Sequence, residues 1–146
     1  MQVLVREARV TEILDLRHRI LRHGLARTAA EFQGDELETT HHVAALADDH
    51  VVGCATILLS SWQGEAAWQL RGMAVDDDYQ ARGVGRLLVA ELEKIARDSS
   101  RQLMWCNART PAIGFYEKLG WKVMSGVFDV PTAGPHVKML KRLSPP

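Results

Sequence analysis

The sequence has few of the residues on which several classes of small protein depend. Its two cysteines, Cys54 and Cys106, provide neither a disulfide framework nor a CxxC pair for a metal. Lys plus Arg and Asp plus Glu number 18 each, so the chain lacks the excess of cations that non-specific binding to nucleic acid requires. No apolar run approaches the roughly 18 residues of a membrane span. We therefore expect neither a nucleic acid nor a membrane as partner.

Length and composition indicate a globular protein. A chain of 146 residues, 47% hydrophobic and 25% charged, corresponds to one domain over residues 1–146, with 144–146 as a loose tail. Residues 1–6 lack the basic start, apolar stretch and cleavage site of a signal peptide. We expect a cytoplasmic protein whose cysteines stay reduced.

Lysine and arginine are absent from Thr28 to Leu70, although the chain as a whole is neutral. Such a stretch is typical of solvated loops and strand edges. The alternative interpretation is that its acidic residues face a cationic ligand. The acidic residues within it are Glu31, Asp35, Glu36, Glu38, Asp48, Asp49 and Glu65.

Hydrophobic periodicity and turn residues predict the order β-α-β-β-β-α-β-α-β-β. This order indicates a mixed α/β or α+β sheet with helices on its faces. Thr11 and Thr110 are the expected N-caps of the first and last helices, with Pro111 in the first turn of the last helix and Gly120 as its C-terminal cap. The predicted strands cover residues 2–6, 42–47, 51–59, 67–75, 103–107, 121–127 and 136–143, and the helices 11–22, 83–99 and 110–119.

Several common site motifs are missing from the sequence. Gly83 and Gly85 open the second predicted helix, but Leu88 stands where a dinucleotide-binding fingerprint needs a third small residue. There is no GxxxxGK[ST] phosphate loop, no GxSxG elbow and no HExxH pair. His41 and His42 are neighbours that point to opposite faces of a strand, so they cannot share a metal ion. We expect no metal.

A strand, a loop with two glycines and a helix N-terminus follow one another between residues 70 and 86. The first N–H groups of a helix have no partner within the helix and carry partial positive charge, so they attract anions. Gly83 and Gly85 would let a phosphate approach, and Arg82 and Arg86 would donate charge-assisted hydrogen bonds. The plainer alternative is a tight turn with two ordinary glycines.

Three sequence blocks resemble those of a known family. Gln80-x-x-Gly83-x-Gly85, after Met73-Ala74-Val75, resembles the coenzyme-A pyrophosphate loop of the GNAT superfamily of N-acetyltransferases. Asn107-Ala108-Arg109 and the segment from Gly114 to Trp121 resemble the next two landmarks of that family, in the same order. The resemblance extends from Gln2 to Leu143, and the run from Phe128 to Met139 is similar to a group of small bacterial members.

The resemblance implies a mixed, mostly antiparallel central sheet with a splayed parallel pair of strands and helices on both faces. It implies acetyl-CoA as acyl donor, with pantetheine in the gap between the splayed strands and the pyrophosphate on the loop before the second helix. The implied coenzyme-A-binding residues are Met73, Ala74, Val75, Gln80, Ala81, Arg82, Gly83, Val84, Gly85, Arg86 and Asn107.

The resemblance also places Tyr116 near the thioester sulfur, as the general acid. Attack of an amine on acetyl-CoA expels a thiolate, and a phenol with a pKa near 10 is protonated at neutral pH and can donate to it. Without the resemblance, Tyr116 is a core aromatic residue of its helix.

The attacking amine must also lose a proton, and the candidate acceptors are Asp35, Glu36, His41, His42 and His136. We predict His136 as the catalytic base, because a residue at the start of the last strand could reach the substrate side and histidine titrates near neutral pH. The alternative is a structural histidine bonded to the preceding loop. Cys106 has no activating base nearby in sequence and is expected to be a small buried hydrophobic residue.

The resemblance places the loop from Gly24 to Thr39 beside the acceptor, where its acids would bind a cationic amine. We predict Asp35 and Glu36 of this loop, together with His42 and Arg71, as substrate-binding residues. The predicted function is transfer of an acetyl group from acetyl-CoA to a primary amine of a small cationic acceptor by direct attack. The alternatives are a catalytically silent coenzyme-A-binding sensor or scaffold and a nucleotide-binding domain, and the chain could form a homodimer.

Overall fold

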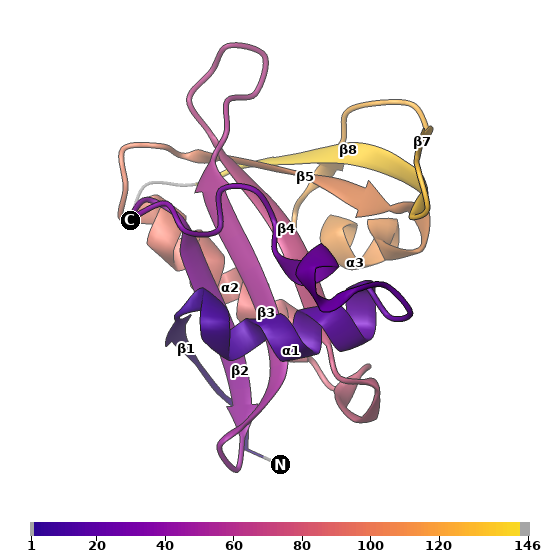
Figure 1. Ribbon diagram of the computed structural model, residues 1–146. Coiled ribbons are helices and arrows are strands. Elements are labelled where there is room, and N and C mark those ends of the chain that lie inside the picture. Colours follow the sequence, from indigo (N-terminus) through magenta and orange to yellow (C-terminus); the bar gives the residue numbers. More distant parts are fainter. Residues whose placement is uncertain (1, 144–146) are drawn as a thin grey trace.

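The computed structural model describes residues 2–143, which form one sheet with helices packed against it (Figure 1). None of the helices within these residues is long and apolar enough to cross a membrane. The strands are β1 (Leu4–Ala8), β2 (His41–Ala47), β3 (His50–Leu59), β4 (Trp68–Val75), β5 (Leu103–Arg109), β6 (Lys122–Val123), β7 (Phe128–Val130) and β8 (Gly134–Arg142). The helices are α1 (Val10–Leu21), α2 (Val84–Arg97) and α3 (Ile113–Lys118), with short 3-10 turns η1 (Arg27–Ala30), η2 (Asp77–Tyr79) and η3 (Thr110–Ala112).

The strands lie in the order β1-β2-β3-β4-β5-β8-β6, and β7 pairs with β8. Every neighbouring pair is antiparallel except β4 and β5, which are parallel. In Figure 1, β5 and β8 run at a clear angle to β2, β3 and β4. The predicted fold class, a mixed and mostly antiparallel sheet with one parallel pair, is confirmed.

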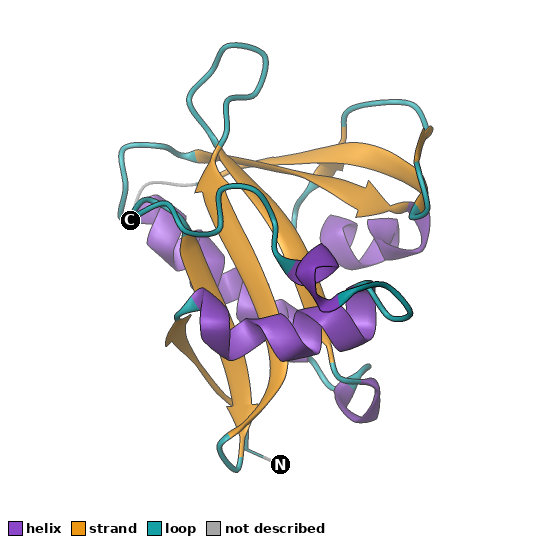
Figure 2. Ribbon diagram, viewed as in Figure 1, coloured by secondary structure: helices purple, strands orange, loops and turns teal. Residues whose placement is uncertain are grey.

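Helices cover both faces of the sheet, as Figure 2 shows. Alternate residues of β2 serve the two faces, because successive side chains of a strand point to opposite sides. Ala44 packs in the cluster that contains Ile13 of α1, whereas Val43 and Ala45 pack in the larger cluster that contains Leu88 of α2. Because apolar residues occupy successive positions of β2, the strand contributes to a core on each side of the sheet.

The N-terminal end of α2 is held close to the sheet. A Cβ atom on Gly53 of β3 would lie only 2.8 Å from Cγ1 of Val84, the first residue of α2. A side chain at position 53 would therefore push the helix outward. Gly53 therefore allows the start of α2 to pack closely against β3.

The two N-caps predicted from sequence are wrong, for local reasons. The first helix begins at Val10 with Arg9 as N-cap, because the Glu12 carboxylate accepts the backbone N–H of Arg9 at 2.7 Å. Thr110 and Pro111 form η3, and α3 begins only at Ile113.

The C-terminal third contains shorter strands than predicted. The strand expected over residues 121–127 is reduced to the two residues of β6, and the unpredicted β7 pairs with β8. Gly120 has the left-handed conformation expected of a C-terminal helix cap, with φ of +91°.

Candidate active site

Strands β4 and β5 separate part-way along their length. Their last paired residues are Leu70 and Cys106, so the β5-facing side of β4 from Arg71 to Val75 has no strand beside it. The cause lies in β4, where the register against β3 moves from Thr56↔Arg71 to Cys54↔Ala74 and leaves one extra residue on β4. An extra residue of this kind is a β-bulge, which bends its strand.

Gly72 is the residue that permits the bulge. Its φ is +65°, a conformation that side chains disfavour. An added Cβ would also lie 3.2 Å from Nε of Arg17 and 3.3 Å from the ring of Phe32. An isolated glycine inside a predicted strand is the sequence signal for such a bulge.

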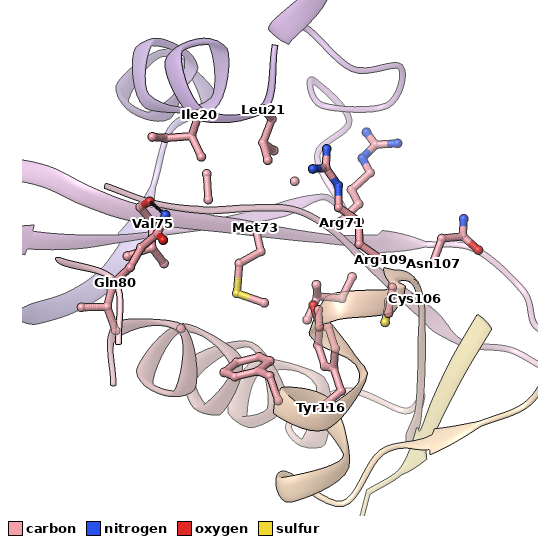
Figure 3. A pocket seen from close by; sticks show the side chains of 18 of the residues that line it. Ile20, Leu21, Arg71, Met73, Val75, Gln80, Cys106, Asn107, Arg109 and Tyr116 are labelled. Carbon is pink, nitrogen blue, oxygen red and sulfur yellow. Dashed lines mark hydrogen bonds between the residues drawn. The ribbon is translucent and has the colours of Figure 1, made fainter. Parts of the chain in front are cut away.

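A cavity of about 950 Å³ occupies the gap between the separated strands. Its walls come from β4, β5, the start of α2, α3, the end of α1 and the start of β8, and Figure 3 shows many of the side chains. Of the predicted site residues, it is lined by Arg71, Met73, Ala74, Val75, Gln80, Ala81, Gly83, Val84, Gly85, Arg86, Asn107, Tyr116 and His136. The remaining four, Asp35, Glu36, His42 and Arg82, do not line it.

One end of the cavity is formed by the loop that precedes α2. Gly83 is the N-cap of α2 with φ of +81°, and no side chain caps the helix. Ala81 also has a positive φ, of +60°. Left-handed residues before a helix turn backbone N–H groups toward a concavity that binds anions. Arg86, in the first turn, lines the same end, so the loop has the donors that a pyrophosphate needs.

Gln80 in this loop and Gly85 in the first turn of α2 also have structural roles. The side chain of Gln80 donates to the carbonyl of Val75 at 3.1 Å and to the carboxylate of Asp77 at 3.2 Å, so it fastens the loop to the end of β4. A Cβ on Gly85 would lie 3.2 Å from the ring of Phe115. Gly85 is therefore needed for close packing of α2 against α3.

The side chain of Tyr116 points from α3 into the cavity. The hydrogen bonds at the C-terminal end of α3 determine its position. The N–H of Gly120 donates to the carbonyl of Glu117 at 3.0 Å, and the N–H of Trp121 donates to the carbonyl of Tyr116 at 3.1 Å. This pair of hydrogen bonds is a Schellman motif, which often brings two hydrophobic side chains together. Here the rings of Tyr116 and Trp121 lie 5.3 Å apart between centroids, so the end of the helix fixes the position of the tyrosine.

The hydroxyl of Tyr116 meets the thiol of Cys106 where β4 and β5 separate. Tyr116 is only 6% exposed, and burial together with the hydrogen bond to Cys106 raises the pKa of its phenol well above the ordinary value. Burial also raises the pKa of the Cys106 thiol to about 12. Both groups are therefore protonated at neutral pH.

A sequence model of the acetyltransferase (GNAT) family matches residues 9–121, more than half of the chain. The chain belongs to the GNAT acetyltransferase family. It is an acyl-CoA-dependent acetyltransferase that uses acetyl-CoA. The cavity fits this donor, because unpaired helix N–H groups and Arg86 stand at one end and a protonated tyrosine stands further along the gap.

Relatives and solved structures agree with the assignment. The uncharacterized N-acetyltransferase YitI of Bacillus subtilis (strain 168) is 32% identical over 142 residues, which are 95% of each chain. The fold matches the crystal structure of an aminoglycoside 6'-N-acetyltransferase complexed with coenzyme A, with a TM-score of 0.79 and 20% identity over 98% of each chain. It also matches Escherichia coli ElaA, with a TM-score of 0.81 and 18% identity over 97% of this chain and 100% of that one.

His136 and Asn107 of the acetyltransferase stand on neighbouring strands of the cavity. The Nδ1–H of His136 donates to the carbonyl of Gly134 at 2.8 Å, because a carbonyl can only accept. Nε2 of the neutral ring is therefore the nitrogen with a free lone pair. The side-chain oxygen of Asn107 accepts a hydrogen bond from Nζ of Lys138 at 3.0 Å, which holds the amide at the rim.

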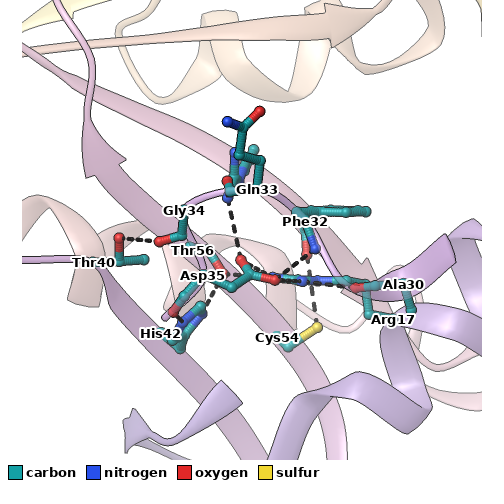
Figure 4. A network of polar contacts seen from close by, with 12 residues as sticks. Arg17, Ala30, Phe32, Gln33, Gly34, Asp35, Thr40, His42, Cys54 and Thr56 are labelled. Carbon is teal, nitrogen blue, oxygen red and sulfur yellow. Dashed lines mark hydrogen bonds and ion pairs between the residues drawn. The ribbon is translucent and has the colours of Figure 1, made fainter. Parts of the chain in front are cut away.

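Asp35 belongs to a buried network behind the cavity wall (Figure 4). Oδ2 accepts from Nη1 of Arg17 at 2.6 Å and from the backbone N–H of Phe32 at 2.8 Å, and Oδ1 accepts from Arg71 at 3.2 Å. Burial by itself raises the pKa of Asp35, but the hydrogen bonds from Arg17 and Phe32 outweigh burial and hold the pKa below its usual value. The carboxylate thus attaches the loop that contains Phe32 and Asp35 to α1 through Arg17 and to β4 through Arg71.

His42 and Glu36 also lie away from the cavity. The Nε2–H of His42 donates to the backbone carbonyl of Asp35 at 2.9 Å, and Nδ1 accepts from the hydroxyl of Thr56 at 2.8 Å. Burial lowers the pKa of this imidazole, so it is neutral and fully bonded. Glu36 is exposed to solvent.

Sequence reasoning missed the arginines at the other end of the cavity. Arg22, at the end of α1, and Arg109, at the end of β5, both line it, together with the ring of Phe32. Arg109 follows Asn107 by two residues on the same strand, and this spacing was the available signal that the two share a face.

No group of three or more metal-ligating residues occurs within residues 2–143.

Proposed function

We propose that the enzyme transfers the acetyl group to a primary amine of a small acceptor by direct attack, with Tyr116 as general acid. The observation that carries the proposal is the protonated, nearly buried hydroxyl of Tyr116 at the point where the strands separate. Acetyl-CoA, when bound, supplies the thioester. As the carbon–nitrogen bond forms and the carbon–sulfur bond breaks, Tyr116 donates its proton to the departing sulfur.

His136 is the proposed base. The hydrogen bond to Gly134 fixes the tautomer, so Nε2 can accept the proton that the amine loses. Its place on β8, opposite Arg109 of β5, keeps it on the wall of the cavity away from the loop before α2. Solvent afterwards removes this proton and returns one to Tyr116.

Direct attack is favoured over an acyl-enzyme because of Cys106, the cysteine that lines the cavity. A nucleophilic cysteine reacts as a thiolate. With a pKa of about 12, only about one Cys106 thiol in 10⁵ is ionised at neutral pH. The thiol is therefore not a nucleophile at neutral pH.

The predicted cationic acceptor has lost the basis on which it rested. Asp35 already accepts hydrogen bonds from two arginines, and Asp35, Glu36 and His42 lie outside the cavity. The acceptor is still expected to be an amine, and the charge that the site favours depends on the residues that line the cavity.

The test measures thiol release from acetyl-CoA with and without a panel of primary amines, and the intact mass of the enzyme after incubation with acetyl-CoA alone. We expect release that depends on added amine and no acetylated enzyme. Binding of coenzyme A without amine-dependent release would support the sensor alternative. A stable acetyl group on Cys106 would contradict direct attack.

A further inference from the structure

The charged groups that line the cavity all have one sign. They are Arg22, Arg71, Arg86 and Arg109, and none of the aspartates and glutamates between residues 2 and 143 lines the cavity. Arg86 belongs to the loop end, where the pyrophosphate is expected. Arg71 and Arg109 lie at the opposite end of the cavity from Gln80, as Figure 3 shows.

Three arginines from three different elements therefore converge on the acceptor end. Arg22 is the C-cap of α1, Arg71 lies on β4 where the strands begin to separate, and Arg109 is the last residue of β5. They are brought together by the fold, since they are far apart in sequence. We name these three residues the arginine cluster.

The arginine cluster has little negative charge to balance it. Within residues 2–143, no carboxylate forms an ion pair with Arg22 or Arg109. Arg71 shares the single carboxylate of Asp35 with the fully buried Arg17, and Nε of Arg71 is buried without a hydrogen-bond partner. Two guanidinium groups, those of Arg17 and Arg71, thus share one carboxylate, and Arg22 and Arg109 pair with none in the part of the chain that the structure describes.

The ring of Phe32 holds several of these guanidinium groups together. The carbons Cζ of Arg17, Arg22 and Arg71 lie 4.1, 4.8 and 5.6 Å from the centroid of the ring. Burial lowers the pKa of Arg22, and the positive charges of Arg109 and Arg17 lower it further. Stacking fixes the positions of the groups, but it leaves their mutual repulsion uncompensated.

We propose that Arg22, Arg71 and Arg109 bind an anionic group, a carboxylate or a phosphate, carried by the amine acceptor. The planar guanidinium fork is suited to such oxyanions, and binding one would balance part of a positive charge that, among the described residues, only the carboxylate of Asp35 meets at present. The inference rests on the proposed function, because it names the class of acceptor for the same reaction.

The arginine cluster has a second consequence for the attacking amine. Neighbouring positive charges disfavour the protonated form of an amine, so they assist His136 in presenting a neutral nucleophile. A polyamine would meet this repulsion without a compensating contact. An acceptor that carries an anionic group is held by the cluster while its amine loses a proton.

The first arm of the test compares matched acceptors, lysine with cadaverine and phosphoethanolamine with ethanolamine. We expect kcat/KM to be about tenfold or more higher for the anionic member of each pair, as for charge-assisted hydrogen bonds. Arg109→Gln should remove that advantage and leave KM for acetyl-CoA unchanged. Arg9→Gln, an exposed arginine outside the cavity, is the matched control and should change neither. Preference for cadaverine over lysine would overturn the proposal.

The second arm asks which substrate carries the anion. Succinyl-CoA and acetyl-CoA are compared with ethanolamine as acceptor. A preference for succinyl-CoA that Arg109→Gln abolishes would assign the anionic group to the acyl donor and overturn its assignment to the acceptor. Equal or lower use of succinyl-CoA is the expected result.

The third arm needs no turnover. Calorimetry in the presence of coenzyme A compares N-acetylglycine with N-acetylglycinamide, which lacks the charge. We expect the acid to bind about tenfold or more tightly, and the double variant Arg22→Gln/Arg109→Gln to lose the difference. Equal binding of the two probes by the wild type would overturn the subsite. Preferential binding of the acid without amine-dependent thiol release would instead refute the proposed transfer.

Discussion

Leu70 of β4 and Cys106 of β5 are the last residues that the two parallel strands pair before they separate. The site is organised around this point. The side chain of Tyr116 lies beside Cys106 at this point. The loop before α2 forms one end of the cavity, and Arg71, the residue after Leu70, lies toward the other end.

The anion-binding end is tested by Arg86→Ala. Loss of a charge-assisted donor to the pyrophosphate should raise the Kd for coenzyme A about tenfold or more. Calorimetry of the variant against the wild type measures this. Lys94→Ala, which removes an exposed cation from the other end of the same helix, should leave the Kd unchanged. Equal effects of the two substitutions would mean that Arg86 acts only through net charge.

The buried ion pair of Asp35 is tested by Asp35→Asn. Removing this carboxylate leaves the fully buried Arg17 without a counter-charge, so the free energy of unfolding should fall by about 3 kcal/mol or more. Glu36→Gln, at the exposed neighbouring position, should change it by less than about 0.5 kcal/mol. Urea unfolding at pH 7 measures both. Similar small values would place the stabilising contacts of Arg17 elsewhere.

The same carboxylate predicts a dependence of stability on pH. Its pKa is lower in the folded protein than in the unfolded chain, so its contribution is full above the unfolded value, near pH 4, and declines as the pH falls below it. The free energy of unfolding of the wild type should therefore fall more steeply than that of Asp35→Asn below about pH 4. Parallel slopes for the two proteins would contradict the assignment.

The bulge in β4 is tested with two glycines. Gly72→Ala places a side chain at a positive φ and against Arg17, so it should destabilise the protein by about 1–3 kcal/mol. Gly114→Ala adds a methyl group to α3 where no atom lies within 4 Å, so it should stabilise by about 0.5–1 kcal/mol. Thermal unfolding distinguishes them by sign. A neutral Gly72→Ala would mean that the bulge does not need glycine.

Most of the order of helices and strands, and the turn that opens α2, could be predicted from the sequence because their signals are local. Alternating residues in the strands, the helical period after Gly83 and the glycine cap at Gly120 each act within a few residues. The N-cap predictions at Thr11 and Thr110 were wrong because neighbouring contacts, such as that of Glu12 with Arg9, decided the boundary.

The acceptor end could not be predicted in the same way, because it depends on contacts between distant segments. Asp35 stands in an acidic stretch, but arginines from α1 and β4 reach it from 18 and 36 residues away. Arg22 and Arg109 come from distant segments of the chain, the end of α1 and the end of β5, and line the same cavity. The acidic stretch in the sequence therefore predicted a negatively charged acceptor site, whereas the charged side chains that line the cavity are arginines.

The role of Tyr116 as general acid is the central claim, and single-turnover measurement of Tyr116→Phe tests it most directly. The substitution removes one hydroxyl and keeps the ring packed against Trp121. We predict that the rate of thiol release falls by about 10²–10⁴, while the Kd for coenzyme A stays within about twofold of wild type. A variant that releases thiol at the wild-type rate, under conditions where chemistry limits the reaction, would show that Tyr116 only packs the cavity wall.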